Sequence, residues 1–394
     1  MPRAEPVTTV RDLLAARTDA NRRFFDDIAA DLASLCHAMA ERFARGGRLI
    51  AVGRTPAARS DVRHVAVEFV HPVIVGKRAL PAIGLAGEDG NLPSRIDVLA
   101  RPDDIAIAFG AGEDGGEAAR ALAVVRARGC LTMAFCPAGA EWELVPPGDD
   151  PDIGQELAET AYHVLWELVH VFFDHRGLLA GRDARPRHDA GPSAFLYPFL
   201  DEREDALEPL LADVRRSVLA KAAEIGALRE QTLTENRATL ESAAAALRAG
   251  LDGGGTLLAL GNGGSATDAM DAVADFQEEW PAIDLTADSA ILTAIANDIG
   301  VEAVFSRQVI AYGRPGDVLL ALSTSGDSRN VVQALAEARS RGLATIAMVG
   351  YDGGRIAADG LADHVVVTRS EHIPRIQEAQ ASAYHVLRRL VGSP

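Results

Sequence analysis

Apolar residues along this chain follow two alternating patterns, one typical of helices and one typical of buried strands. Over residues 8–45 they recur three and four positions apart, which predicts a long helical region that ends at Gly46 and Gly47. The unbroken run RLIAVG at 48–53 then predicts a buried strand, and residues 57–70 predict a helix. Strand and helix patterns continue to alternate in this way. The pattern therefore predicts an α/β fold in which each parallel sheet carries helices on both faces.

The order of these elements occurs twice, and the two occurrences correspond in sequence. RGGRLIAVG at 45–53 matches GGGTLLALG at 253–261, and QELAETAYHVLWELV at 155–169 matches QEAQASAYHVLRRLV at 377–391. An internal repeat of this kind indicates two units of one type in a single chain. We hypothesise that the tandem repeat reproduces a homodimer within one polypeptide.

The repeat also suggests where the domains begin and end. Residues 174–205 are rich in Gly, Pro, Arg and Asp, which predicts a linker. We therefore expect a first copy at 1–173, which includes long N-terminal helices, and a second copy at 206–394. Each copy is expected to form one parallel sheet between two helical layers.

Copy two contains a glycine-rich turn between a strand and a helix, GNGGS at 261–265. Its glycines allow the backbone to bend sharply, Ser265 adds a hydroxyl, and the N-terminus of the following helix favours an anion. A second loop, STSGDS at 323–328, follows the strand pattern DVLLAL. Because loops at the carboxyl ends of parallel strands can converge on one ligand, we interpret the two as a phosphate-binding site. A glycine-rich turn without a ligand is the alternative for either loop alone.

Copy one has lost both loops. GRTP at 53–56 stands where copy two has GNGG, and GAGEDG at 110–115 stands where copy two has STSGDS. The serines are absent, and Glu113 and Asp114 would repel a phosphate group. We therefore predict that copy one binds no phosphate.

Copy one instead carries polar residues at helical spacing. His64 and Glu68 are four residues apart and share one face of a predicted helix. Gln155 and His163 are eight residues apart and lie close to one face of the last helix of copy one. Taken alone, His64 and Glu68 would more often form a solvated helix contact, and His163 would be a packed helix residue.

Several motifs of copy two resemble those of the sugar isomerase (SIS) domain and, within that superfamily, the phosphoheptose isomerases. They run from Val214 to Val391 and include GNGGS, ANDIG at 296–300, FSRQV at 305–309, GDVLLALSTSGDS at 316–328 and RIQEAQASAYH at 375–385. The resemblance implies an aldose–ketose isomerase that converts sedoheptulose 7-phosphate to heptose 7-phosphate through an enediol. It also leaves a non-catalytic alternative, because some SIS proteins only sense sugar phosphates or bind a protein such as the bacterial replication initiator.

The resemblance assigns roles to residues of both copies. In copy one it implies a site that can hold zinc, formed by His64, Glu68, Gln155 and His163. The corresponding residues of copy two are Asp271, Asp275, Gln377 and His385. The implied acid–base residues are Glu68 and His163 in copy one, and Asp275 and His385 in copy two. Substrate and phosphate contacts are expected from ten residues of copy two: Asn262, Gly263, Gly264, Ser265, Asp288, Ser323, Thr324, Ser325, Ser328 and Gln377.

These residue types suit the chemistry. Isomerisation moves a proton from the carbon beside a carbonyl to its neighbour, which a carboxylate and an imidazole can carry out near neutral pH. A zinc ion would polarise the carbonyl as a Lewis acid. Two arrangements stay open: either copy two is the complete active site, or its phosphate loops combine with the His/Glu set of copy one. Pro374, where the family often has Asp, leaves the identity of the sugar open.

Composition narrows the classes of partner and location. A net charge of −17 over 394 residues argues against a nucleic-acid-binding surface and against an anionic membrane partner. No apolar run suggests a signal peptide or a membrane span, and the three cysteines lack zinc spacing. We therefore expect a cytoplasmic protein that binds a phosphorylated sugar. We also expect a homo-oligomer, in which a dimer gives a pseudo-tetramer of SIS units.

Overall fold

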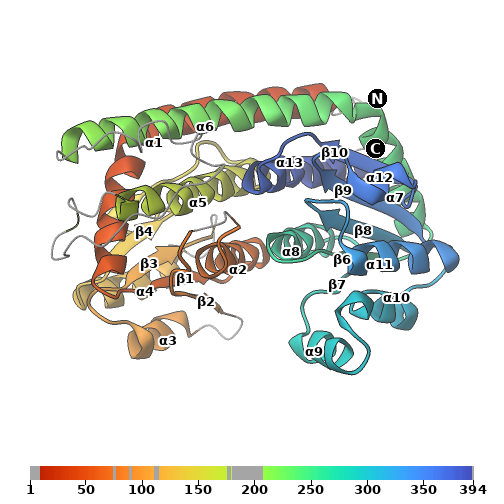
Figure 1. Cartoon of the computed structure of the whole chain (residues 1–394), viewed down its shortest axis with the longest axis horizontal. Helices are drawn as coiled ribbons and strands as arrows, with labels where there is room; N and C mark the ends of the chain where they lie inside the picture. The colour runs from red at the N-terminus through yellow and green to blue at the C-terminus, as the bar shows by residue number, and fades with distance from the viewer. Residues whose placement is uncertain are drawn as a thin grey trace, which may run out of the picture. The chain divides into compact units, whose positions relative to one another are not determined.

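The chain forms two compact units in the computed structural model (Figure 1). We call Ala20–Glu224 the N-terminal unit, and Met1–Asp19 together with Ile225–Pro394 the C-terminal unit. The structure describes residues 9–73, 77–87, 91–110, 115–174, 179 and 207–392.

The division between the units falls within two long helices. These are α1 (Val10–Ala44) and α6 (Leu207–Glu235), and each contributes residues to both units. Apart from Asp174 and Leu179, the predicted linker at 174–205 lies outside the described residues.

The N-terminal unit is built on a parallel five-stranded sheet with the strand order β2-β1-β3-β4-β5. Its strands are β1 (Leu49–Gly53), β2 (Ala82–Ala86), β3 (Ile105–Ala108), β4 (Leu131–Ala134) and β5 (Trp142–Glu143). Every residue of β1, β3 and β4 is buried, which is expected where helices cover both faces of a parallel sheet. Leu49 and Ala51 belong to the core on one face, and Ile50 and Val52 to the core on the other.

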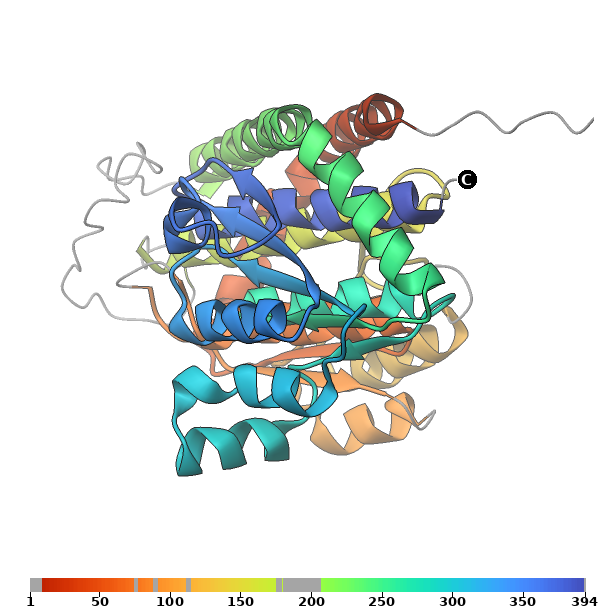
Figure 2. The same ribbon diagram turned by 90° about the vertical axis from the view of Figure 1, so that its right-hand side faces the viewer.

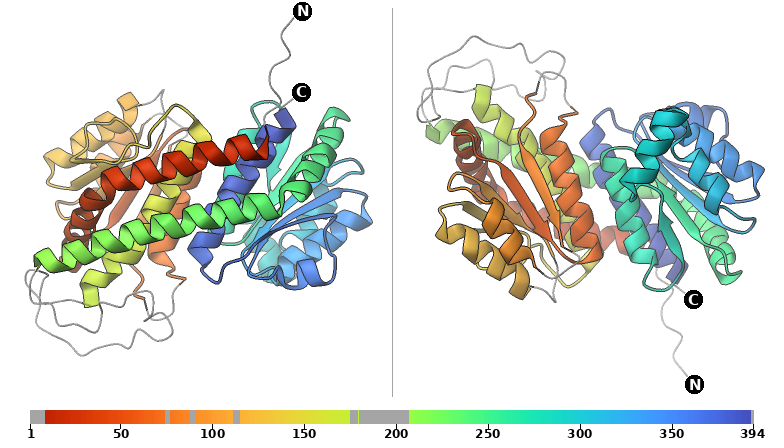
Figure 3. Two further views of the ribbon diagram at one scale, coloured as in Figure 1. Left: turned by 90° about the horizontal axis from the view of Figure 1, so that it is seen from above. Right: turned by 90° about the horizontal axis from the view of Figure 1, so that it is seen from below.

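Helices cover both faces of this sheet (Figure 3). On one face lie α2 (Pro56–Val70), α5 (Pro151–Asp174) and the parts of α1 and α6 that belong to this unit. On the other face lie α3 (Leu92–Leu99) and α4 (Gly115–Ala127). The fold places α2 beside α5, so polar residues from both helices can meet inside one apolar layer.

The C-terminal unit has a second parallel sheet with the corresponding order β10-β9-β8-β6-β7. Its strands are β6 (Leu257–Leu260), β7 (Ala282–Asp284), β8 (Val318–Ser323), β9 (Ala344–Gly350) and β10 (His364–Thr368). In both sheets the first strand along the chain pairs with the second and the third, and helices connect the parallel strands.

Two helical layers enclose this second sheet as well (Figure 2). One layer contains α7 (Arg237–Asp252), α8 (Gly264–Phe276) and α13 (Ile373–Gly392). The other contains α9 (Ser289–Asp298), a 3-10 helix at Val301–Ala303, α10 (Ser306–Tyr312), α11 (Arg329–Ser340) and α12 (Gly354–Ala358).

The predicted α/β class, with two parallel sheets, helices on both faces and a long N-terminal helix, is confirmed. Within the described ranges, no helix is both long and apolar enough to cross a bilayer.

Candidate functional site

The glycine-rich turn of the C-terminal unit joins β6 to α8. Gly263 is the residue before α8 and has a φ of 58°, a conformation that favours glycine, and no side chain caps this helix. A Cβ atom added at Gly261 would lie 2.1 Å from the carbonyl oxygen of Ser265, so only glycine fits there. The turn therefore brings backbone and the buried Ser265 to an uncapped helix N-terminus, which is a general anion-binding geometry.

The serine-rich loop between β8 and α11 lies beside this turn. Its shape is held by its own hydroxyls, because the backbone N–H of Gly326 donates to Ser323 Oγ at 3.2 Å and that of Asp327 donates to Ser325 Oγ at 3.2 Å. The strands β6 and β8 are hydrogen-bonded neighbours, so both loops follow carboxyl ends at one edge of the sheet.

A reciprocal pair of amides joins the two loops. Asn262 Nδ2 donates to Asn330 Oδ1 at 3.0 Å, and Asn330 Nδ2 donates to Asn262 Oδ1 at 2.8 Å. The structure thus brings the two predicted phosphate loops together. Asn330, at the start of α11, is a contributor that the sequence analysis did not single out.

Asp288 has a different position. Its carboxylate accepts hydrogen bonds from the backbone N–H groups of Ala290 (2.8 Å) and Ile291 (3.0 Å), so it is the N-cap of α9. A short acidic residue directly before a helix pattern is a recognised N-cap signal, and the sequence contained it. Its predicted substrate contact stays a prediction.

The acid–base residues predicted for copy two, the partly exposed Asp275 and the buried His385, lie close together between α8 and α13. His385 Nε2 lies 3.2 Å from Asp271 Oδ2 and 3.5 Å from Asp275 Oδ2. The hydroxyl of Tyr384 donates to Asp271 Oδ2 at 2.8 Å. Gln377, on the same helix as His385, is also buried. Asp271 is thus engaged by two neighbours at the position where copy one has His64.

Copy one has an ion pair at the place where copy two has the amide pair Asn262–Asn330. Arg54 corresponds to Asn262 and Glu117 to Asn330, and Arg54 Nη1 lies 3.3 Å from Glu117 Oε2. The nearly buried carboxylate of Glu117 also accepts from the backbone N–H of Leu92 at 3.1 Å.

The start of α2 is closed to an anion as well. Thr55 Oγ1 accepts from the backbone N–H of Ala58 at 3.2 Å, and Pro56 has no N–H to offer. Glu113 and Asp114, which were predicted to repel a phosphate, lie outside the described residues.

Three of the four polar residues predicted in copy one, His64, Glu68 and His163, come together inside the N-terminal unit. Nε2 of His64 lies 3.3 Å from Nε2 of His163, and 3.9 Å from Glu68 Oε1. The histidines and Glu68 are 0–2% exposed, so the solvated-contact alternative for His64 and Glu68 is wrong. Burial lowers the pKa of His64 well below its ordinary value, and the neighbouring His163 lowers it further. A neutral imidazole is the form that binds a metal ion.

Three further residues near this cluster, Glu159, Asp61 and Tyr162, were not singled out from the sequence. Glu159 Oε1 lies 4.0 Å from His64 Nδ1, and Glu159 is fully buried one turn before His163 on α5. Asp61 Oδ1 accepts from Gln155 Nε2 at 3.1 Å and from the Tyr162 hydroxyl at 3.4 Å. Helical spacing from His64 and His163 was the available signal for Asp61 and Glu159.

Comparisons with known proteins agree with this architecture. The SIS domain family matches residues 222–350. The phosphoheptose isomerase of Chlorobium phaeobacteroides is 47% identical over 173 residues, which are 41% of this chain and 76% of the relative. That of Nitratidesulfovibrio vulgaris is 41% identical over 182 residues, 44% of this chain and 86% of the relative.

Two solved structures match nearly the whole chain at low identity and so show the fold alone. The C-terminal domain of glucosamine-fructose-6-phosphate aminotransferase from Francisella tularensis has a TM-score of 0.60 at 10% identity, covering 97% of this chain and 94% of that one. Tagatose-6-phosphate ketose/aldose isomerase from Escherichia coli has a TM-score of 0.55 at 13% identity, and the match covers 98% of this chain and 94% of that chain. The two sequence relatives show that this chain belongs to the phosphoheptose isomerase family of SIS-domain proteins.

Proposed function

We propose that this protein is a phosphosugar isomerase that interconverts a ketose and an aldose, with sedoheptulose 7-phosphate and heptose 7-phosphate as the pair. The observation that carries the proposal is that Asn262 and Asn330 join the glycine-rich turn to the serine-rich loop at the sheet edge. Their hydroxyls and backbone N–H groups suit a phosphate, which an acidic chain can bind only through such a local site. Relatives named phosphoheptose isomerase support the same class of substrate.

The reaction has two steps, each with one proton removed and one added, and it leaves the composition of the sugar unchanged. From the ketose, a carboxylate removes a proton from C1 while the C2 carbonyl oxygen gains one, which gives the enediol. The O1 hydroxyl then loses its proton as C2 gains one, which gives the aldose. In the C-terminal unit Asp275 and His385 can serve as this acid–base pair, and in the N-terminal unit Glu68 and His163 can.

The N-terminal cluster fits a zinc ion. Two nitrogens bound to one tetrahedral zinc at about 2.05 Å are roughly 3.3 Å apart, which matches the separation of 3.3 Å between His64 Nε2 and His163 Nε2. Ligand atoms of these histidines and Glu68 all lie within 4.8 Å of one another. We propose His64, His163, Glu68 and Gln155 as the ligands, and zinc would supply Lewis-acid polarisation of the carbonyl.

An isomerase assay on the purified chain tests the function. We expect turnover of sedoheptulose 7-phosphate, loss of that turnover after chelation, and its return on adding zinc. Binding of the sugar phosphate without turnover, with and without zinc, would contradict the isomerase and support the sensing or protein-binding alternative. Turnover that chelation leaves unchanged would contradict the proposed zinc ligands but not the isomerase activity.

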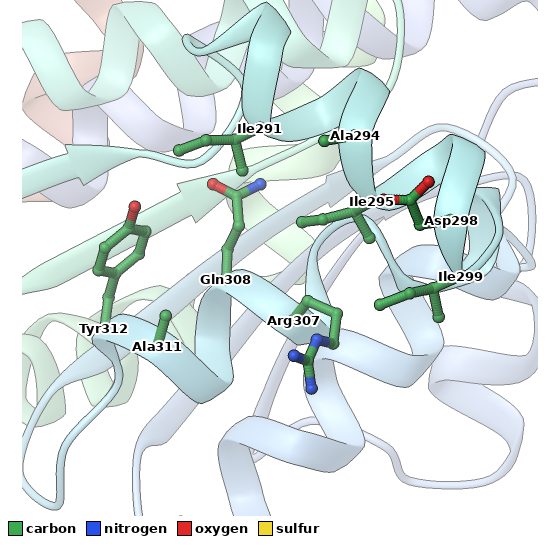
Figure 4. A pocket seen from close by; sticks show the side chains of 9 residues that line it. All are labelled: Ile291, Ala294, Ile295, Asp298, Ile299, Arg307, Gln308, Ala311 and Tyr312. Atoms are coloured by element: carbon green, nitrogen blue, oxygen red, sulfur yellow. The ribbon is translucent and has the colours of Figure 1, made fainter.

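We further propose that the chain self-associates through the surface formed by α9 and α10. None of the residues of α9 is buried. Ile299 is 58% exposed and Val301 66% exposed, a large apolar exposure for one short segment. A hollow of about 250 Å³ lies between the two helices (Figure 4).

The charges on this surface suit a second copy of the same chain. Asp298 of α9 and Arg307 of α10 line the same hollow together with Ile295 and Tyr312 (Figure 4). A two-fold axis through such a patch brings the acid of one copy to the base of the other, while the isoleucines pack together.

Replacing Ile299 by glutamate is expected to shift the oligomer toward monomer, because a charge would be buried without a partner. Sedimentation velocity over a range of protein concentrations measures the shift. The matched control is Val98→Glu, at a residue of α3 that is 88% exposed, which should leave the association unchanged. Equal association of Ile299→Glu and the wild-type chain would contradict the proposed surface.

A further inference from the structure

The hydrogen bonds of Asp61 single it out within the N-terminal cluster. Asp61 lies on α2 one turn before His64 and is 5% exposed. Its Oδ1 atom accepts from the Gln155 amide at 3.1 Å and from the Tyr162 hydroxyl at 3.4 Å. It therefore connects α2 to two residues of α5, one of them the predicted ligand Gln155.

The bond from Gln155 decides which end of its amide is available. An amide has a donor nitrogen and an acceptor oxygen, and a carboxylate only accepts, so Asp61 can hold Gln155 only through the nitrogen. Asp61 therefore makes no hydrogen bond with Gln155 Oε1. This buried oxygen has no hydrogen-bond partner among the residues that the structure describes. Oxygen is the atom through which an amide binds a metal ion.

We propose that Asp61 is a positioning residue that fixes the amide of Gln155 with its oxygen available for a metal ion. The proposal rests on the zinc set proposed above. Asp61 does not itself enter that set; it acts by excluding the flipped amide, in which an N–H group would replace the ligand oxygen. Tyr162 donates to the same carboxylate oxygen and so holds Asp61 in place.

The corresponding residues of the C-terminal unit form a different arrangement. Asp268 corresponds to Asp61, and Tyr384 to Tyr162. There, the tyrosine donates to Asp271, the residue that replaces His64, at 2.8 Å. Tyr384 and Tyr162 therefore donate to carboxylates at different positions of the two repeats. The matched control is Asp317→Asn, which makes the same chemical change at a buried carboxylate that accepts from the backbone N–H groups of Thr256 and Arg314, outside the proposed zinc set.

The test measures zinc affinity of the full chain by competition with a chromophoric chelator. We expect Asp61→Asn to weaken zinc binding about 10–100-fold, the usual effect of removing an outer partner of a ligand. The amide introduced at position 61 can either accept from or donate to the Gln155 amide, so it no longer excludes the flipped orientation. Asp317→Asn should leave the affinity unchanged.

A complementary swap separates orientation from a general loss of structure. In the double variant Asp61→Asn with Gln155→Glu, the new amide donates to one carboxylate oxygen and leaves the other oxygen free, so zinc affinity should recover. Wild-type affinity in Asp61→Asn, or no recovery in the double variant, would overturn the inference. A wild-type chain that isomerises the sugar but binds no zinc would also overturn it, while leaving the isomerase intact.

Discussion

Sugar-phosphate binding is expected to weaken at least 100-fold when Ser265 and Ser325 are both replaced by alanine. A hydrogen bond to a charged group contributes about 1.5–3 kcal/mol, so losing two costs about 3–6 kcal/mol, and about 1.4 kcal/mol corresponds to a factor of ten. The two serines lie in the separate loops that the Asn262–Asn330 pair joins, so the variant removes one hydroxyl from each loop. Isothermal titration calorimetry with sedoheptulose 7-phosphate measures the change.

The matched control for this variant is Ser340→Ala. Ser340 is an exposed serine at the far end of α11 in the same unit, where its hydroxyl donates to the carbonyl oxygen of Glu337 at 2.8 Å. It should bind the sugar phosphate as the wild-type chain does. Unchanged affinity in the double variant, with an unchanged melting temperature, would rule out the phosphate-binding role of the loops.

Turnover is expected to fall by a factor of about 10²–10⁴ when His163 is replaced by alanine, because general acid–base catalysis contributes about that much. The KM for the sugar phosphate should change little, since His163 lies outside the glycine-rich turn and the serine-rich loop that we propose to bind the phosphate. Steady-state kinetics at saturating zinc separate the two parameters.

His385→Ala is the informative partner of this variant, because His385 occupies the corresponding place in the second copy, 3.5 Å from Asp275. A loss of turnover with His385→Ala and none with His163→Ala would assign the acid–base chemistry to Asp275 and His385, and would contradict the expectation for His163. Glu68→Gln should follow His163→Ala, since its ligand atom belongs to the same buried group.

Local pattern predicted the elements closely. The run at 48–53 is β1 at Leu49–Gly53, and the helix predicted at 57–70 is α2 at Pro56–Val70. Buried parallel strands read as unbroken apolar runs, and helices read as repeats of three and four, so neighbours along the chain carry most of the information. The same reasoning missed Asp288 as the N-cap of α9, although the N-cap signal was present.

Pairs of residues from different elements were harder to foresee. Glu117 was not singled out, yet its carboxylate pairs with Arg54 at the place where the other unit has two asparagines. Whether such side chains come into contact depends on the relative orientation of two helix N-termini at the edge of one sheet. A shift of one ångström would break a hydrogen bond, and sequence spacing contains no such detail.

The sequence by itself determined which residues share a helix face or a loop, including His64 with Glu68 and the serines of STSGDS, because those relations depend on helical period and on chain connectivity. Only the tertiary structure decided which of them meet across elements. Asp61 and Gln155 are 94 residues apart and bond because α2 packs on α5. The physical reason is that a hydrogen bond extends over about 3 Å and needs a particular orientation, which only the packing of two helices provides.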